Sequence, residues 1–310
     1  MQNKIIYVGL AVALIAAMFG LYLTITGSNR IIEDHKNMAD KLDKDFQRLF
    51  VRTGPYAYTG APLGYVVEFE NGVKFYVAGD TGISADMKLV VGDYYKPDVA
   101  ILPIGNFFTM GSKEAAYATS LVNPKKYVIP AHYASYEFLT SNVDEFSAEL
   151  GKYNLAAQSL ALKIGEEKDV LGVKVVWLGH GSFLFESPSG KRILIDPAAK
   201  YSAAWPEEYR NLNGFGKVDM VLLTHAHPDH VITSDLEDIE RLYGPIIFAQ
   251  YEAGQWIEEH TSLEMIMSFM NAGANIGKEE IAKLGLPTEK MGDIRVYAVP
   301  AAHTSSATIQ

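Results

Sequence analysis

Short apolar segments alternate with amphipathic segments along most of the chain after residue 54. Apolar runs of roughly four to eight residues predict strands, and apolar positions with a period of about 3.6 predict helices. The predicted strands are Gly64–Phe69, Val99–Pro103, Val173–Leu178, Arg192–Ile195 and Ile246–Phe248. The predicted helices are Lys113–Val122, Val143–Tyr153, Ser234–Tyr243, Leu263–Asn271 and Lys278–Leu284, with Asn142 and Ser234 as N-caps of two of them. This alternation predicts a mixed α/β fold.

The N-terminal region has a different pattern. Ile5–Ile25 contains 21 residues without a charge, and a helix of that length, rising about 1.5 Å per residue, would span a bilayer core of roughly 30 Å. We therefore expect residues 1–29 to form a single transmembrane anchor. Residues 30–53 carry apolar side chains at helical spacing and predict an amphipathic juxtamembrane helix. Lys4 and the amino terminus favour an extracytoplasmic position for residues 54–310.

Composition excludes several kinds of protein. The chain has a net charge of −10, which argues against a nucleic-acid partner, because phosphate neutralisation needs clustered Lys and Arg. It has no cysteine, so a disulfide framework and thiolate metal ligands are both excluded. The roughly 250 residues after the N-terminal region are sufficient for one catalytic domain with a sizeable core.

The most specific chemical signal follows the apolar segment Met220–Leu223. The residues that come next are Thr224, His225, Ala226, His227, Pro228, Asp229 and His230. Imidazole nitrogen and carboxylate oxygen are ligands that zinc, iron and manganese accept. A strand that ends in a tight turn directs alternate side chains to one point. The run therefore predicts a metal site.

Three other loops present a candidate ligand directly after a predicted strand. These ligands are Asp80 after residues 73–77, His132 after residues 126–129, and His303 after residues 295–299. Functional sites in α/β proteins lie at the carboxyl ends of strands. We therefore expect all of these loops to meet at one site.

The His-any-His-any-Asp-His run at residues 225–230 resembles the signature of the metallo-β-lactamase superfamily. The resemblance implies an αββα sandwich and a hydrolase that uses a metal-bridging hydroxide on an ester, lactone or phosphodiester-type substrate, either a small molecule or lipid-like. It also implies two divalent metal ions, with zinc expected first and manganese or iron as alternatives. On this basis, the ligands are His225, His227 and His303 for one metal and Asp229, His230 and His132 for the other, with Asp80 bridging both.

The order of these loops differs from the family's order, in which the His-rich loop comes first. Residues 54–168 resemble the usual C-terminal half, and residues 169–310 resemble the usual N-terminal half. Domain termini often lie close together, so we interpret the chain as a circular permutant joined through Ile164–Gly172. The alternatives are half-domains that associate with other chains, including a homo-oligomer whose subunits exchange halves.

Two further segments resemble one branch of the family. Leu178–Ser182 and Ile193–Pro197 are similar to segments of ascorbate-6-phosphate lactonase-like and other broadly described metal-dependent hydrolases. The resemblance implies that His180 lies beside the metals and takes part in catalysis with Asp229; the alternative is a structural histidine. Asp196 is expected to orient the ligands from behind. The aromatic residues in loops, which either line a pocket or belong to the core, are Phe107, Phe108, Tyr133, Tyr136 and Trp205.

A second function class is compatible with these features. The permuted order and the helical stalk also suit a membrane-tethered structural or interaction protein that keeps the fold with little or no catalysis. The complete ligand set favours the hydrolase. Bound metal without turnover of ester, lactone or phosphodiester substrates would favour the interaction protein.

Overall fold

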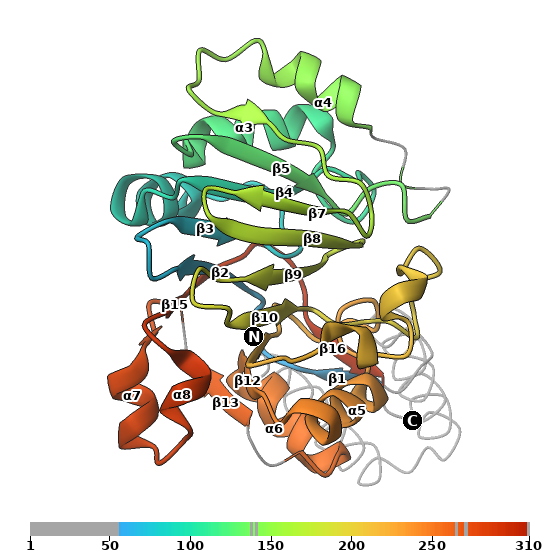
Figure 1. The fold of residues 1–310 in the computed structure, drawn as a ribbon. Coiled ribbons are helices and arrows are strands. Elements are labelled where there is room, and N and C mark those ends of the chain that lie inside the picture. Colours follow the sequence, from blue (N-terminus) through green and yellow to red (C-terminus); the bar gives the residue numbers. More distant parts are fainter. Residues whose placement is uncertain (1–55, 137–138, 140–141, 264–265, 270–271, 309–310) are drawn as a thin grey trace, which may run out of the picture. The chain divides into compact units, whose positions relative to one another are not determined.

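Two stacked β-sheets carry the fold of the described residues (Figure 1). The computed structural model describes residues 56–136, 139, 142–263, 266–269 and 272–308, which belong to one unit, Tyr56–Ile309. The predicted anchor at residues 5–25 and the predicted amphipathic helix at residues 30–53 lie outside this set. No helix in the described ranges is long and apolar enough to cross a bilayer.

Each of the two large sheets has seven described strands. The first has the order β14 (Asn275–Ile276), β15 (Arg295–Pro300), β2 (Leu63–Glu68), β3 (Lys74–Val77), β4 (Val99–Pro103), β5 (Tyr127–Ala131) and β6 (Gln158–Ser159). The second has the order β13 (Ile266–Phe269), β12 (Ile246–Gln250), β11 (Met220–Leu222), β10 (Arg192–Ile195), β9 (Ser182–Glu186), β8 (Val173–Gly179) and β7 (Glu167–Val170). A small third sheet pairs β1 (Tyr56–Tyr58) with β16 (Ser306–Thr308).

Alternation along the strands divides the core into two layers. In β10, Ile193 and Ile195 belong to the cluster between the two sheets, whereas Leu194 belongs to the cluster on the outer face of the second sheet. Successive side chains of a strand point to opposite faces, so strands β8 to β12 of the second sheet each contribute to both clusters. The rings of Phe69, Phe75 and Phe185 meet between the sheets, with centroids 5.4 to 6.0 Å apart.

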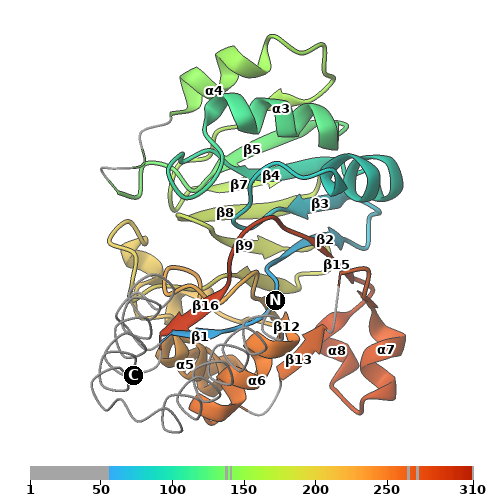
Figure 2. The same ribbon diagram turned by 180° about the vertical axis from the view of Figure 1, so that it is seen from behind.

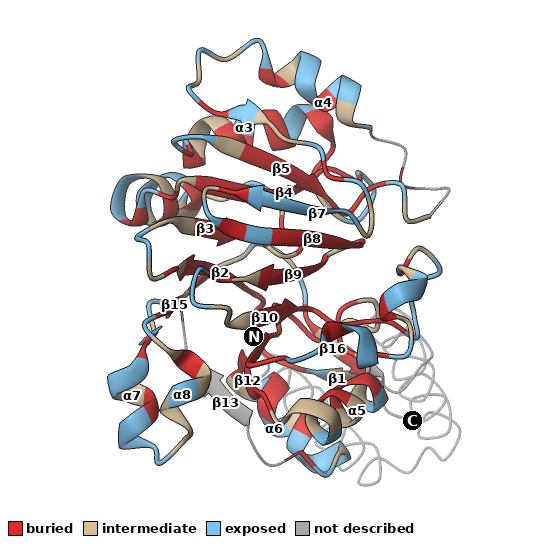
Figure 3. Ribbon diagram, viewed as in Figure 1, coloured by how far each residue is buried: buried red, intermediate tan, exposed pale blue. Residues whose placement is uncertain are grey.

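Helices cover the outer faces of both sheets. The described helices are the π-helix η1 (Met87–Tyr95), α3 (Ser112–Val122), α4 (Val143–Leu150), η2 (Glu207–Tyr209), η3 (Asn213–Phe215), α5 (Thr233–Tyr243), α6 (Tyr251–His260), α7 (Lys278–Lys283) and α8 (Thr288–Met291). Side chains of η1, α3 and α4 pack with the first sheet, and those of α5 and α6 pack with the second. The strands are largely buried and the helices expose one side (Figure 3). The mixed α/β class is therefore confirmed, with layers in the order helix, sheet, sheet, helix.

Two predicted details are wrong. Residues 263–271 do not form a helix, because β13 lies in this segment and pairs in parallel with β12, Ile247 opposite Ile266. A short apolar run is ambiguous between helix and strand, and here the free edge of β12 decides. Ser234 is not an N-cap, since α5 begins at Thr233 after Ile232. Asn142 is confirmed as an N-cap, with its side chain accepting a hydrogen bond from Glu145 N at 2.9 Å.

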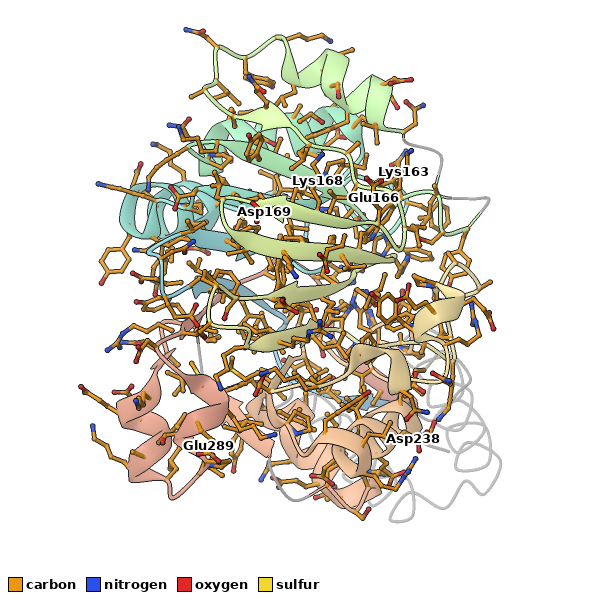
Figure 4. The ribbon with its side chains drawn as sticks, viewed as in Figure 1. Lys163, Glu166, Lys168, Asp169, Asp238 and Glu289 are labelled. Carbon is orange, nitrogen blue, oxygen red and sulfur yellow. The ribbon has the colours of Figure 1, made fainter. Side chains whose placement is uncertain are left out.

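The segment between the two halves of the chain forms part of a hairpin. Strands β7 and β8 pair antiparallel around Leu171 and Gly172, whose φ angles of 60° and 84° suit a two-residue type I′ turn. The predicted joining segment, residues 164–172, thus contains a strand. Its charged residues lie on the surface near β7, as the labels of Lys163, Glu166, Lys168 and Asp169 show (Figure 4).

The two ends of the described chain lie side by side. Tyr56 in β1 is opposite Thr308 in β16, and the two strands run antiparallel (Figure 2). The last long strand, β15, also pairs antiparallel with β2, the first long strand, from Leu63 to Glu68. Segments from opposite ends of the sequence are therefore neighbours within one sheet.

We expect Phe185→Ala to lower the free energy of unfolding by about 3 to 5 kcal/mol, because the change leaves a cavity between the sheets. Denaturant titration of the detergent-purified full chain, followed by tryptophan fluorescence, measures this loss. Leu89→Ala is the matched control: the side chain is 62% exposed, so its removal should change stability by less than about 0.5 kcal/mol. Equal losses in both variants would contradict the proposed inter-sheet core.

Candidate metal centre

Strand ends bring the candidate ligands together. Asp80 follows β3, His132 follows β5, the 225–230 loop follows β11, and His303 follows β15. Strands β3, β4 and β5 are parallel, as are β10, β11 and β12, so their carboxyl ends share one edge of each sheet. The two stacked sheets thus present their ligand-bearing loops to each other.

The buried carboxylate of Asp80 lies at the middle of this group. Its Oδ2 atom is 3.1 Å from Nε2 of His132 and 3.4 Å from Nε2 of His230. The same oxygen is 3.8 Å from Nε2 of His303 and 4.0 Å from Nε2 of His225. One oxygen atom is therefore surrounded by four imidazole nitrogens, which is the position that a bridging ligand requires.

The donor atoms form three overlapping groups, each within 4.8 Å. These groups are His225, His227 and His303; His132, His180, Asp229 and His230; and Asp80, His225 and His230. The first group is the set predicted for one metal. The second contains the set predicted for the other metal and adds His180, while the third links the two.

The residues of this centre fit divalent metal ions. Among the described residues, Nε2 of His230 and Oδ1 of Asp80 are buried atoms with no hydrogen-bond partner. Burial holds the pKa of His225, His227 and His303 below the usual value, which favours neutral imidazoles with one unprotonated ring nitrogen each. Neutral imidazoles with carboxylates form a donor set that suits zinc, manganese or iron.

The second group holds a proton that a cation would replace. Burial lowers the pKa of His230, but the charges of Asp80, Asp229 and Asp196 outweigh it and raise the pKa well above the usual value. Burial likewise opposes ionisation of Asp80, yet His132 and His230 hold its pKa well below the usual range. The carboxylates thus attract positive charge to this position, and metal binding would release the proton of His230.

Asp196 fixes the orientation of the ligand loop from behind. Its Oδ1 accepts a hydrogen bond from Thr224 N at 2.7 Å, and its Oδ2 accepts from Thr224 Oγ1 at 2.6 Å. The same Oδ2 lies 2.9 Å from Nδ1 of His230, and Thr224 Oγ1 lies 3.0 Å from Nδ1 of His225. Since the threonine proton goes to Asp196, Thr224 Oγ1 must accept from Nδ1 of His225. The Asp196 carboxylate, which has no proton to donate, accepts from Nδ1 of His230. This tautomer leaves Nε2 of each histidine as the acceptor that a metal ligand needs.

His180 lies against the second group. Its Nε2 is 2.9 Å from Oδ2 of Asp229, and its ring centroid is 3.7 Å from that of His132. Burial lowers the pKa of His180 to about 4, although the hydrogen bond to Asp229 opposes this effect. A neutral His180 therefore donates from Nε2 to the Asp229 carboxylate and fixes its position.

Strained backbone marks the same region. His132, His180 and Asp196 have φ angles of 56°, 53° and 44°, in the left-handed region that side chains rarely adopt. The backbone N–H of His132 donates to the carbonyl of His180 at 3.0 Å, and this contact ties two of the strained positions together. Each such residue costs roughly 1 to 3 kcal/mol, and such strain clusters at functional sites.

The sequence analysis missed several residues that support the centre. Thr224 stands next to His225, yet its role depends on Asp196, which is 28 positions away in the chain. Tyr65 donates from its hydroxyl to the carbonyl of Leu223 at 2.6 Å, and Ser305 Oγ accepts from Ala226 N at 3.1 Å. No local pattern marks these residues, because each acts on a segment that is distant in sequence.

The aromatic candidates divide into two classes. Trp205 and Tyr133 are buried, with Trp205 packed on Phe215 and Tyr133 stacked on Trp177. In contrast, Phe107 and Phe108 are exposed, and Tyr136 is half-buried beside His180. Tyr201, which was not among the candidates, has a further exposed ring, and its centroid lies 6.3 Å from that of the Tyr136 ring.

We expect Asp196→Asn to weaken metal binding by about 10- to 100-fold. An amide presents a donor to one of its partners, so the hydrogen bonds that set the tautomer of His225 and His230 are lost. Competition with a chromophoric chelator measures the affinity. Asp238→Asn on α5 is the matched control, because Asp238 makes only surface ion pairs with Lys200 and Arg241 (Figure 4). Unchanged affinity in Asp196→Asn would refute the orienting role.

Comparison with known proteins identifies relatives for part of the chain. Residues 174–307 match the family described as the beta-lactamase superfamily domain. A UPF0173 metal-dependent hydrolase of Methanopyrus kandleri is 45% identical over 116 residues, which cover 37% of this chain and 49% of that protein. A UPF0173 metal-dependent hydrolase of Rubrobacter xylanophilus is 42% identical over 114 residues, covering 37% of this chain and 46% of that protein.

One solved structure also matches part of the chain. The metallo hydrolase Igni18 from Ignicoccus hospitalis is 32% identical, with a TM-score of 0.31, and the match covers 36% of this chain and 50% of that one. The chain spans about half the length of the curated relatives named above. Asp80 and His132 lie outside the residues that match the family.

Proposed function

We propose that the chain is a metal-dependent hydrolase of the metallo-β-lactamase superfamily, with a binuclear centre. The observation that carries this proposal is the position of Asp80 Oδ2 within 4.0 Å of Nε2 atoms from four histidines. The relatives named as metal-dependent hydrolases support the reaction class. The substrate is a small or lipid-like molecule with an ester, lactone or phosphodiester bond.

The two metal ions are assigned to the two ligand groups on either side of Asp80. His225, His227 and His303 would hold one ion, and Asp229, His230 and His132 would hold the other. When bound by these residues, two divalent ions would supply a water of lowered pKa and would polarise the bond to be cleaved. Zinc is expected, and a His and carboxylate set also suits manganese or iron.

Asp229 and His180 are assigned to the reaction itself. The Asp229 carboxylate is partly exposed at the centre, whereas His180 is almost fully buried behind it. The hydrogen bond from His180 fixes one carboxylate oxygen, so the other oxygen has a defined direction toward ligand or substrate. Turnover that is lost on changing Asp229 would support a hydrolase over an interaction protein.

We also propose that the domain is a circular permutant. The support comes from the chain order of the ligands, from β1 paired with β16 at the two ends of the described chain, and from the pairing of β2 with β15. Asp80 and His132 lie outside the residues matched by the family, yet both contact histidines within that match, Asp80 at His230 and His132 at His180. Residues 164–172, which include β7, would then join the former termini.

A rearranged variant tests the permutation. Residue 308 is linked to residue 56 through a Gly-rich hairpin loop of about four residues, and the chain is opened between Gly165 and Glu166. Because the new loop joins neighbouring strand ends, the variant should fold and bind metal as the natural order does. A control variant is opened within α3 and should not fold. Folding of the rearranged variant together with failure of this control supports the proposal. If both variants fail to fold, the proposal is contradicted.

Residues 5–25 are proposed to anchor the domain in a membrane as a single span, with the domain on the extracytoplasmic side. The support is the run of 21 uncharged residues with Lys4 before it. Protease digestion of intact and opened membrane vesicles reports the side on which residues 56–308 lie.

Asp80→Ala is the direct test of the binuclear centre. Elemental analysis of wild type, coupled to light-scattering mass, should give two metals per chain. The variant should lose at least one metal, with hydrolysis reduced by at least about a hundredfold, since the bridging oxygen is removed. Two metals bound to wild type without turnover of ester, lactone or phosphodiester substrates would instead favour a membrane-tethered interaction protein.

A further inference from the structure

Exposed aromatic side chains extend outward from the metal centre. The Tyr136 ring lies 5.4 Å from that of His180, and the Tyr201 ring lies 6.3 Å from that of Tyr136. Burial and then the charge of Asp229 raise the pKa of the Tyr201 phenol. Tyr201 is nevertheless 48% exposed. The two tyrosines thus form a wall that begins at the centre and reaches solvent.

A second aromatic pair lies on the neighbouring loop. Gly105 packs so closely on the backbone of His132 that a Cβ there would approach its carbonyl oxygen to 1.8 Å. Two residues later, Phe107 is 74% exposed and contacts the ring of Phe108 edge-on, with centroids 4.7 Å apart. We call Phe107, Phe108, Tyr136 and Tyr201 the aromatic rim.

The backbone is strained where it presents this pair. Asn106 and Phe107 have φ angles of 65° and 62°, which are rare for side chains and rarest for bulky ones. The Asn106 side chain accepts a hydrogen bond from Phe107 N at 2.9 Å and stabilises the turn. A strained turn that holds an exposed phenyl ring is costly, and strain of this kind clusters at functional sites, which favours a binding role.

The loop of Tyr201 is also held in place. The guanidinium of Arg210 donates to the carbonyls of Ala199, Ser202, Ala203 and Trp205, which enclose Tyr201 in the sequence. Lys200 is anchored as well, since its Nζ lies 3.2 Å from Asp235 and 3.0 Å from Asp238. Tyr201 therefore projects from a loop with a defined conformation.

Charge at this edge argues against a strongly anionic substrate group. The ligand-bearing and flanking loops comprise residues 78–86, 104–112, 132–142, 196–205, 223–232 and 301–308, and Lys200 is the only Lys or Arg among them. Its ammonium group is already paired with two carboxylates. Recognition of a phosphate group normally uses Arg or Lys, and these loops offer no such unpaired side chain.

We propose that the aromatic rim binds an uncharged, apolar group of the substrate, and that the bond cleaved beside it is a carboxylic ester or lactone. This inference rests on the proposed hydrolase function and narrows it. In the reaction, the oxygen of water bonds to the carbonyl carbon and the bond to the leaving oxygen breaks. One proton of water passes to the leaving oxygen, and the other is released with the carboxylate product.

The test compares two substrates that share the scissile ester. Phenyl acetate and 4-sulfophenyl acetate are given to the metal-loaded full chain in nanodiscs of zwitterionic lipid. We expect the sulfonated ester to have a kcat/KM lower by about tenfold. Tyr201→Ala should raise KM for phenyl acetate by about tenfold, with kcat within about twofold and metal content unchanged, as expected for loss of one aromatic contact.

Two variants serve as controls for this effect. Tyr201→Phe keeps the ring and should retain the wild-type KM. Tyr94→Ala removes a ring that is 75% exposed near the end of η1, just before β4 begins, and should leave both constants unchanged. Equal kcat/KM for the two esters, or a KM that is insensitive to Tyr201→Ala, overturns the inference and leaves the hydrolase function intact.

A binding measurement separates this inference from the hydrolase proposal. Benzyl methyl ketone has the shape of phenyl acetate but has no ester bond, and saturation-transfer NMR measures its affinity without turnover. Binding that is weakened about tenfold by Tyr201→Ala and retained in Tyr201→Phe supports the rim even if no ester is hydrolysed. In that case only the hydrolase proposal fails. Ketone binding that is equal in wild type and Tyr201→Ala overturns the rim.

Discussion

The buried carboxylate of Asp80 is the group on which the rest of the structure depends. Its Oδ2 lies among imidazoles from three separate segments, residues 132, 225–230 and 303. A buried charge is costly unless it is paired, so the fold must bring all of these segments to one point. The two sheets do so by ending their parallel strands at the same edge, and the Asp196 network then fixes which ring nitrogen faces the carboxylate.

This arrangement explains where the backbone strain lies. His132, His180, Asp196 and Phe107 all adopt left-handed φ angles in the loops around the centre. Packing of the two sheets supplies the stability that such local cost requires. The paired first and last strands of the described residues, β1 and β16, lie beside the ligand loop through Ser305, whose hydroxyl contacts both Thr59 and Ala226 N. The position of the chain ends is therefore coupled to the site.

Local pattern was sufficient for most strands and for every candidate ligand, because each ligand directly follows an apolar run such as 220–223 or 295–299. Local pattern gave the wrong secondary structure where a segment that is distant in sequence determines it. Residues 263–271 read as a helix, but the edge of β12 makes Ile266–Phe269 a strand. Likewise, no sequence pattern around Tyr65 predicts its hydrogen bond to the carbonyl of Leu223. The position of Tyr201 near the centre is evident only from its ring contact with Tyr136. The candidate ligands could be named from the sequence, whereas the residues that orient them required the structure.

The central claim is that one chain closes its own binuclear site. A crystal structure of the metal-loaded protein, with anomalous data collected at the metal's absorption edge, tests this claim most directly. The account predicts two anomalous peaks about 3.5 to 4 Å apart, with Asp80 between them and His303 and His132 supplied by the same chain. A single peak, or peaks whose ligands come from two different chains, would contradict it.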